Sequence, residues 1–171
     1  PITIKKPNGG TEDLFRGFMA SNSEVGKASF CLSLFLYREV CSNRMVFGTR
    51  HLGSVKIRHS SGAPERFEQE GAKLLNRYAS NTLEDTKKTL AASMSHSVGD
   101  TDEKVAKWLG RRGFTKASAA AIVQRAKEEE GQASTLWDVV QGGTAMARGL
   151  HNQDKRVELE RKVTKLLSHA A

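Results

Sequence analysis

The chain has 171 residues and a formal net charge of +8, from 27 Lys and Arg against 19 Asp and Glu. This length is typical of one domain with its own hydrophobic core. No apolar run approaches the roughly 20 residues of a membrane-spanning helix, and the N-terminal PITIKKPNGG lacks the apolar stretch of a signal peptide. Two cysteines, Cys31 and Cys41, provide neither a disulfide framework nor the paired ligands of a zinc site. We therefore expect a single cytoplasmic domain without a membrane segment.

The positive charge is unevenly distributed along the chain. Residues 1–60 carry nine basic and four acidic side chains, so they hold most of the excess. Such an excess attracts a polyanion, and nucleic acid is the commonest polyanion in a cytoplasm. A soluble protein with a basic isoelectric point explains the charge equally well. Charge alone therefore does not decide the function.

The first third of the chain has the pattern of strands, before the turn-forming SSGAP at 60–64. In residues 30–37, one face of an extended chain carries Phe30, Leu32, Leu34 and Leu36. The opposite face carries Cys31, Ser33, Phe35 and Tyr37. The leucine face is expected in the core. The second face is either another buried face or a surface on which a ligand stacks, and the pattern favours burial.

Two further strands are predicted before residue 60. RMVFG at 44–48 is a second apolar run that ends at a glycine. SVKIRH at 54–59 alternates, with Val55 and Ile57 on one face and Ser54, Lys56 and Arg58 on the other. This last strand is expected to be half exposed.

After residue 60 the apolar spacing becomes that of helices. Pro64 suits a first helical turn, and one long helix, or two joined at 79–81, is predicted up to Gly99. Further helices are predicted from Asp100 to the GRRG at 110–113, from Thr115 to Gly131, from about Ser134 through Val140, and from about Gln153 to Leu167. The chain is thus expected to be one α+β domain over 1–171. A small antiparallel sheet in 1–60 is followed by five or six helices in 61–171.

Five motifs carry a resemblance to a known family. They are, in order, NSEVGKASF, VCSNRMVFG, WLGRRGFT, TLWDVVQGGT and DKRVELERKVTKLL. Together they resemble the phage- and plasmid-encoded family of domains of unknown function number 932, from about Asn22 to about Leu167. The resemblance implies a cytoplasmic protein of a mobile element, and such elements commonly encode proteins that act on DNA. The family supplies no catalytic residues to transfer, its members usually have a further N-terminal portion, and Arg44 stands where similar sequences often have a small or apolar residue.

No catalytic residue, metal site or cofactor is predicted. The sequence contains no nucleophile elbow, phosphate loop or H-E-x-x-H helix. The carboxylates of GTEDLFRG at 10–17 would need partners from other elements to hold a metal, and His51 and His59 would need a third ligand. Cys41 is predicted to be a buried structural cysteine and not a nucleophile activated by His51.

Two segments of the helical region allow more than one interpretation. The glycines of QGGTAMARG at 141–149 interrupt a helical pattern, either to hold a phosphate or to allow close helix packing, and packing is favoured. The EEE at 128–130 is a metal site, a partner site or a solvated helix end, and a solvated end near Arg125 and Lys127 is favoured.

The helix pair within 100–131 resembles a helix-turn-helix in outline. Its second helix begins with an alanine run and ends acidic. Phosphate contacts from Arg111 and Arg112 are therefore favoured over reading of bases.

Binding of nucleic acid is the function that the sequence favours, with single-stranded DNA in replication or recombination of a mobile element as the expected ligand. Cations interleaved with aromatic side chains are typical of single-strand binders. The predicted binding residues are Arg38, Arg44, Arg50, Lys56, Arg58, Tyr37, Arg111 and Arg112. One alternative is a non-catalytic assembly protein that forms a homo-oligomer through its two tryptophans and the glycine-rich helix. A lower alternative is a metal-dependent nuclease.

Overall fold

The computed structural model describes residues 1–22, 29–38, 44–45 and 53–170. Within these residues the strands are β1 (Ile2–Lys5), β2 (Thr11–Ser21), β3 (Phe30–Tyr37), β4 (Arg44–Met45) and β5 (Ser54–Ile57). The helices are α1 (Ala63–Ser80), α2 (Glu84–Ser95), α3 (Asp102–Gly110), α4 (Lys116–Glu130), α5 (Leu136–Arg148), α6 (Gln153–Thr164) and the 3-10 helix η1 (Lys165–His169). The protein is therefore α+β, with its sheet in the first third, as the sequence predicts.

The sheet is antiparallel at every described pairing. β1 and β2 form a hairpin whose turn contains Gly9, at the positive φ of 84° that glycine adopts without strain. β3 pairs with β2 along one edge, and with β4 and β5 along successive parts of the other edge. β1 and β2 are not among the individually predicted strands, because Arg16 and Gly17 break the apolar alternation of β2.

β3 is covered on both faces. Its leucines are at most 1% exposed, and Leu32 lies close to Gly71 of α1. On the opposite face Ser33 and Phe35 are also buried, whereas the flanking positions of that face are half buried. Burial of the second face, which the pattern favours, is thus confirmed at its centre.

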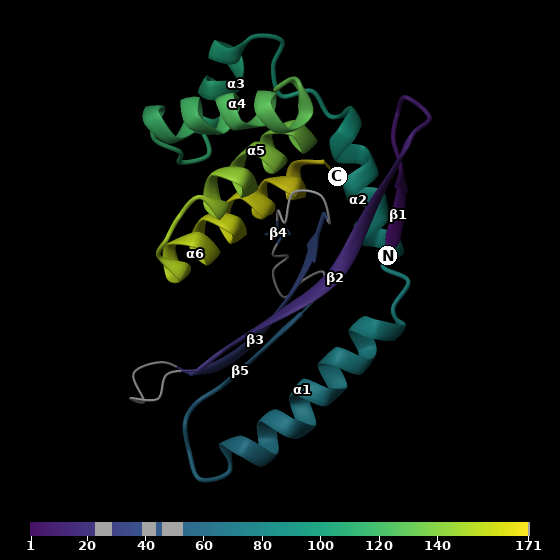
Figure 1. The fold of residues 1–171 in the computed structure, drawn as a ribbon, viewed down its shortest axis with the longest axis vertical. Helices are drawn as coiled ribbons and strands as arrows, with labels where there is room; N and C mark the ends of the chain where they lie inside the picture. Colours follow the sequence, from purple (N-terminus) through teal and green to yellow (C-terminus); the bar gives the residue numbers. More distant parts are fainter. Residues whose placement is uncertain (23–28, 39–43, 46–52, 171) are drawn as a thin grey trace.

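Helices lie on both sides of the sheet, with α1 on one side and α3 to α6 on the other (Figure 1). The helical conformation is interrupted between α1 and α2 at residues 81–83, where Leu83 adopts a left-handed φ of 57°. Arg16 of β2 donates to the carbonyl oxygens of Tyr78, Ala79 and Asn81 at the C-terminal end of α1. This cation satisfies carbonyls that have no partner within the helix.

The predicted helix boundaries are confirmed at α4, whereas the start of α3 differs from the prediction. Thr115 caps α4 and Gly131 ends it in the left-handed conformation. At α3 the predicted start at Asp100 is wrong, because the helix begins at Asp102. Thr101 is the N-cap, because its Oγ1 accepts from Lys104 N at 3.3 Å, while Asp100 forms an ion pair with the Lys104 side chain.

The glycines of α5 allow close helix packing, as predicted. A Cβ at Gly142 would lie 2.4 Å from the Ile122 carbonyl oxygen of α4, and a Cβ at Gly143 would lie 2.6 Å from Val163 of α6. Both distances are shorter than real carbon contacts allow. α5 therefore packs against α4 and α6 with its backbone near theirs, and its side chains are nearly all buried.

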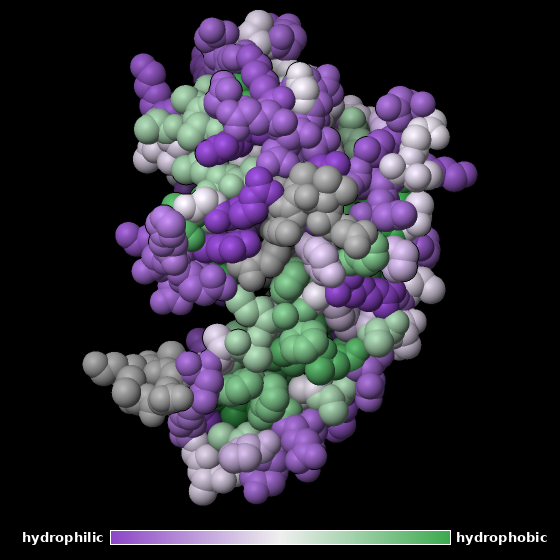
Figure 2. Space-filling view, viewed as in Figure 1, coloured by the Kyte–Doolittle hydropathy of each residue, from purple (hydrophilic) through white to green (hydrophobic). Residues whose placement is uncertain are grey.

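One apolar region remains at the surface. Figure 2 shows hydrophobic residues gathered over the half of this face where β2, β3 and α1 lie. Phe18 of β2 is the large apolar side chain with substantial exposure among the described residues, at 57%. No helix in the described part of the chain is long and apolar enough to cross a membrane.

Candidate nucleic-acid interface

The last helical segment carries a group of cations on one side. Arg161 and Lys162 are adjacent in α6. Lys165, at the start of η1, lies four residues after Arg161 and three residues after Lys162. At this spacing Lys165 projects between the other two. All three side chains are exposed.

Arg161 joins this group to the sheet. Its Nη2 donates to Ser33 Oγ at 2.8 Å. Ser33 pairs with Ser54, and the next pair on the same face is Cys31 with Lys56. Residues two apart on a strand lie about 6 to 7 Å from each other. Lys56 therefore projects, exposed, from the same sheet face that Arg161 contacts.

Lys162 joins the group to the loop between α3 and α4. Its Nζ donates to the Gly113 carbonyl oxygen at 2.6 Å and lies 4.4 Å from the centroid of the Phe114 ring. This contact places the exposed Arg111, two residues before Gly113, near the end of α6.

We call this set the basic band. It consists of Lys56, Arg111, Arg161, Lys162 and Lys165. Within the described residues no carboxylate forms an ion pair with any member. Several other cations are paired, as in Arg125 with Glu128 and Lys127 with Asp102. The band is thus a region of uncompensated positive charge that three distant segments build together.

A second group, the Trp108 cluster, adjoins the band at the end of α3. It consists of Trp108, Arg112 and His169. The Arg112 guanidinium stacks 3.5 Å from the Trp108 ring centroid and donates through Nη1 to the Trp108 carbonyl oxygen at 3.1 Å. His169 of η1 meets the same ring edge-on, with centroids 5.9 Å apart. The indole therefore holds two basic side chains together.

Electrostatic repulsion operates within the Trp108 cluster. Burial, and then the nearby charge of Arg111, lowers the pKa of Arg112 below its ordinary value. Burial also lowers the pKa of His169, with further contributions from Arg112 and His96. Both shifts disfavour the charged form, which is what a cluster without a counter-anion produces.

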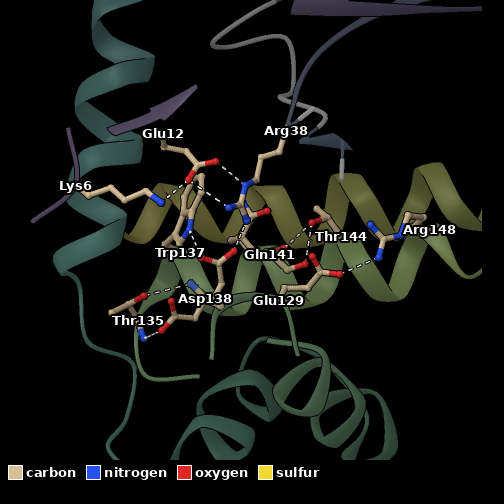
Figure 3. Close-up of polar contacts among 12 residues, drawn as sticks. Lys6, Glu12, Arg38, Glu129, Thr135, Trp137, Asp138, Gln141, Thr144 and Arg148 are labelled. Carbon is tan, nitrogen blue, oxygen red and sulfur yellow. Dashed lines mark hydrogen bonds and ion pairs between the residues drawn. The ribbon is translucent and has the colours of Figure 1, made fainter. Parts of the chain in front are cut away.

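Arg38 occupies a different environment, shown in Figure 3. Its Nε donates to Glu12 Oε1 at 2.6 Å, and its Nη1 donates to Glu130 Oε1. Lys6 Nζ lies 2.6 Å from the other oxygen of Glu12. Trp137 Nε1 donates to Glu130 Oε2 at 3.2 Å. The network links the β1–β2 hairpin, the end of β3 and the α4–α5 connection.

The Arg38 network is largely withdrawn from solvent, since its side chains at Arg38, Glu12 and Glu130 are 14%, 9% and 12% exposed. Burial acts to lower the pKa of Arg38, but Glu130 and Glu12 more than offset this and hold it above its ordinary value. Burial raises the pKa of the Glu130 carboxyl, against the attraction of Arg38. A cavity of about 330 Å³ adjoins the network, lined in part by Lys6, Glu130 and Trp137.

This network corrects the prediction of a solvated EEE segment. Glu128 is exposed and pairs with Arg125 as expected. Glu129 instead binds Arg148 of α5, and Glu130 binds Arg38. The last turn of α4 is therefore a bridge to other elements, because tertiary contacts bring cations to its carboxylates.

The structure separates the sequence-predicted binding residues into three groups. Lys56, Arg58 and Arg111 are exposed. Arg112 is half buried in the Trp108 cluster, Arg38 is held by two carboxylates, and Tyr37 is half buried beside Phe15 and Phe35. Arg44 lies in β4 opposite Tyr37, and Arg50 lies outside the described residues.

No group of three or more His, Cys, Asp or Glu side chains in the described part of the chain is placed to hold a metal ion. Cys31 is a free, half-buried cysteine whose Sγ lies 3.5 Å from Ser33 Oγ. Cys41 and His51, the pair weighed for nucleophilic chemistry, lie outside the described residues.

The sequence prediction omits Arg161, Lys162 and Lys165. The signal that identifies them is local: three cations at helical spacing i, i+1 and i+4, beyond the last acidic residue of the helix. Their connection to Lys56 and Arg111 has no local signal, since it depends on contacts between distant segments.

The comparisons with known proteins give one match. The family model described as a domain of unknown function (DUF932) matches residues 2–165. No curated protein and no solved structure matches. The matched region begins with β1 and extends past the end of α6, so it contains the sheet, the Arg38 network and all five residues of the basic band. The chain therefore belongs to the DUF932 family of domains of unknown function.

Proposed function

We propose that the protein binds nucleic acid along the basic band, prefers single-stranded DNA and reads little sequence. Its place in the cell is the cytoplasm, in replication or recombination of a phage, plasmid or other mobile element. The resemblance to phage- and plasmid-encoded sequences supports this setting.

The observation that carries the proposal is the basic band itself. Its five side chains come from β5, the α3–α4 loop and the α6–η1 segment, and no described carboxylate neutralises them. Exposed cations held together repel one another, so an arrangement without counter-charge favours a polyanion. Contacts to phosphates also carry no sequence information, which accounts for weak sequence preference.

The path of the band supports a single strand over a duplex. The band turns from the sheet across α6 to the α3–α4 loop, and its cations are joined by side-chain contacts to Ser33 and Gly113. Duplex DNA has a persistence length of about 150 base pairs and bends at a cost of several kcal/mol over a short site. A flexible single strand can follow such a turn at less cost.

Salt-dependent binding of a fluorescein-labelled oligonucleotide tests the proposal, measured by fluorescence anisotropy. The double variant Lys56→Gln/Lys165→Gln changes two exposed side chains that make no contact with a described carboxylate. Each lost phosphate contact reduces the log–log salt slope by about 0.7 for a single strand, so the slope should fall by about 1.4. Affinity at low salt should weaken roughly tenfold or more.

The matched control is Lys73→Gln/Lys88→Gln, which removes the same charge from exposed positions on α1 and α2. It should bind nearly as the unchanged protein does. Equal effects of the two double variants would mean that net charge, and not the band, governs binding. Absence of binding to any oligonucleotide at low salt would reject the function altogether.

Self-association is a second candidate, favoured by the exposed Phe18 of β2 and by the apolar region that Figure 2 shows over β2, β3 and α1. Trp137 and the glycines of α5, which the sequence suggested for assembly, make contacts within the chain. Trp137 is 3% exposed, and Gly142 and Gly143 pack against α4 and α6. Trp108 is half buried and contacts Arg112 and His169, so we place the assembly role at the exposed Phe18.

A further inference from the structure

The Trp108 cluster contains an arginine edge without an acceptor. Arg112 uses Nη1 to bind the Trp108 carbonyl oxygen. Its Nε is buried, and no acceptor in the described part of the chain lies within hydrogen-bonding distance of it. Because Nε has almost no accessible surface, it is closed to a ligand in this arrangement. The donor of Arg112 that is neither buried nor hydrogen-bonded within the described residues is Nη2, which can donate a charge-assisted hydrogen bond to a phosphate oxygen.

The charge around this edge is positive. Arg111 is close enough to Arg112 to disfavour its protonated form, and His169 responds to both Arg112 and His96. Neither arginine forms an ion pair with a carboxylate among the described residues. Two arginines and the His169 imidazole thus lie together at the end of α3, without an ion pair to a described carboxylate.

We propose that the Trp108 cluster, together with Arg111, binds a phosphate monoester at the end of the nucleic-acid strand that lies on the basic band. This inference rests on the proposed function and adds a site specific for strand ends. A terminal monoester carries about −1.5 to −2 charge at pH 7 and three acceptor oxygens. A phosphodiester within the strand carries one negative charge and presents two such oxygens.

Charge and position both favour the monoester. Arg111 and Arg112 supply two permanent positive charges, which a dianion neutralises and a monoanion does not. The cluster also lies at one end of the band, past the contact of Lys162 with Gly113. A strand that follows the band from Lys56 across α6 therefore arrives at the cluster with one of its ends.

The test compares three single-stranded oligonucleotides of one sequence with a 5′-phosphate, a 3′-phosphate or hydroxyls at both ends, each with an internal fluorophore. One phosphorylated form should bind about tenfold more tightly than the hydroxyl form, the effect of one additional charge-assisted contact. The preferred end gives the direction of the strand on the band. Inorganic phosphate added as a competitor should reduce the preference towards that of the hydroxyl form.

Two variants place the preference at the cluster. Arg112→Lys keeps the charge and loses the planar guanidinium that stacks on Trp108 and positions Nη2, so the preference should fall to twofold or less. Arg111→Gln changes an exposed side chain and should reduce the preference while the fold is kept, as checked by thermal melting. Lys73→Gln on α1 is the control and should leave the preference unchanged.

His169 gives an independent readout through pH. Burial, Arg112 and His96 hold the pKa of His169 below its ordinary value in the protein alone. A bound dianion favours the imidazolium, so binding takes up a proton and the monoester preference should grow as pH falls from 7.5 to 6.5. His169→Gln should remove most of this pH dependence, with His96, Arg111 and Arg112 still present.

The possible outcomes separate the inference from the proposed function. Equal, salt-dependent binding of all three oligonucleotides would overturn the terminal site and leave nucleic-acid binding intact. A preference that persists in both arginine variants would overturn its placement at the Trp108 cluster. No binding of any oligonucleotide would overturn both proposals together.

Discussion

Arg38 and Arg112 show how neighbours decide what an arginine does. Arg38 lies between Glu12 and Glu130, and these carboxylates hold its pKa above the ordinary value. Arg112 stacks on Trp108 with another arginine nearby, and burial with that charge lowers its pKa. Arg38 is thus a structural cation, whereas Arg112 has no carboxylate partner among the described residues.

Loss of Arg38 should destabilise the fold strongly. In Arg38→Ala, Glu12 and Glu130 remain largely buried with Lys6 as the remaining cation near Glu12. Removing one partner of a buried ion pair costs about 3 to 5 kcal/mol. Arg125→Ala is the control, because its pair with Glu128 is about half exposed and such pairs contribute about 0 to 1 kcal/mol. Urea denaturation at pH 7.5 measures both free energies of unfolding.

The free energy of unfolding that is lost in Arg38→Ala should be smaller at lower pH. Burial raises the pKa of Glu130, and loss of Arg38 removes the attraction that opposes this rise. A raised pKa in the folded state means that stability is present at low pH and is lost as pH rises through that pKa. The free energy lost relative to the unchanged protein should therefore be smaller at pH 5 than at pH 7.5. A deficit that is the same at both pH values would contradict the assignment of the buried carboxylates.

At the scale of elements, α5 organises the helical half of the molecule. It packs against both α4 and α6, and its two central glycines permit this approach. The same packing fixes α6, whose C-terminal end carries three of the five cations of the basic band. A change in the α4–α5 contact should therefore affect both stability and the interface.

Gly142→Ala tests this contact. The added methyl would meet the backbone of Ile122 and Ala126, which cannot rotate away, so we expect a loss of about 1 to 3 kcal/mol of stability. Gly110→Ala is the matched control in α3, where a Cβ has no neighbour within 4 Å. It should be neutral or stabilising by up to about 1 kcal/mol, since alanine is the better helix former. Thermal melting should show a clear decrease in melting temperature for Gly142→Ala. For Gly110→Ala the melting temperature should be unchanged or higher.

On the scale of the whole molecule, the surface divides by character. Polar residues cover the helical half in Figure 2, whereas the half with α1, β2 and β3 exposes apolar residues. Large exposed apolar areas commonly mark contacts with another molecule. The apolar region over α1, β2 and β3 is thus the surface on which we expect contact with a second copy.

Light scattering at increasing protein concentration tests the apolar surface. The mass should rise above that of one chain, and Phe18→Glu should shift it towards the monomer, because a carboxylate replaces the 57% exposed ring. Phe18→Leu keeps an apolar side chain and should still associate. A monomer at every concentration would leave the apolar surface without a role in self-association.

Local sequence patterns determined the class of the protein and many of its boundaries. The apolar alternation around Leu34 predicts β3, Thr115 and Gly131 predict the two ends of α4, and the paired glycines predict close packing of α5. These features depend on interactions within a few residues, so composition and periodicity are sufficient to identify them.

Tertiary structure alone decided which charges are buried, paired or gathered. Arg38 meets Glu130 across a separation of 92 residues, and Arg161 meets Ser33 across 128. No periodicity links residues so far apart, because their contact depends on how the sheet and α4 to α6 pack together. For this reason the sequence predicted single basic residues without their partners, whereas the fold assigned Arg38 to a buried network and placed Arg161, Lys162 and Lys165 beside Lys56 and Arg111.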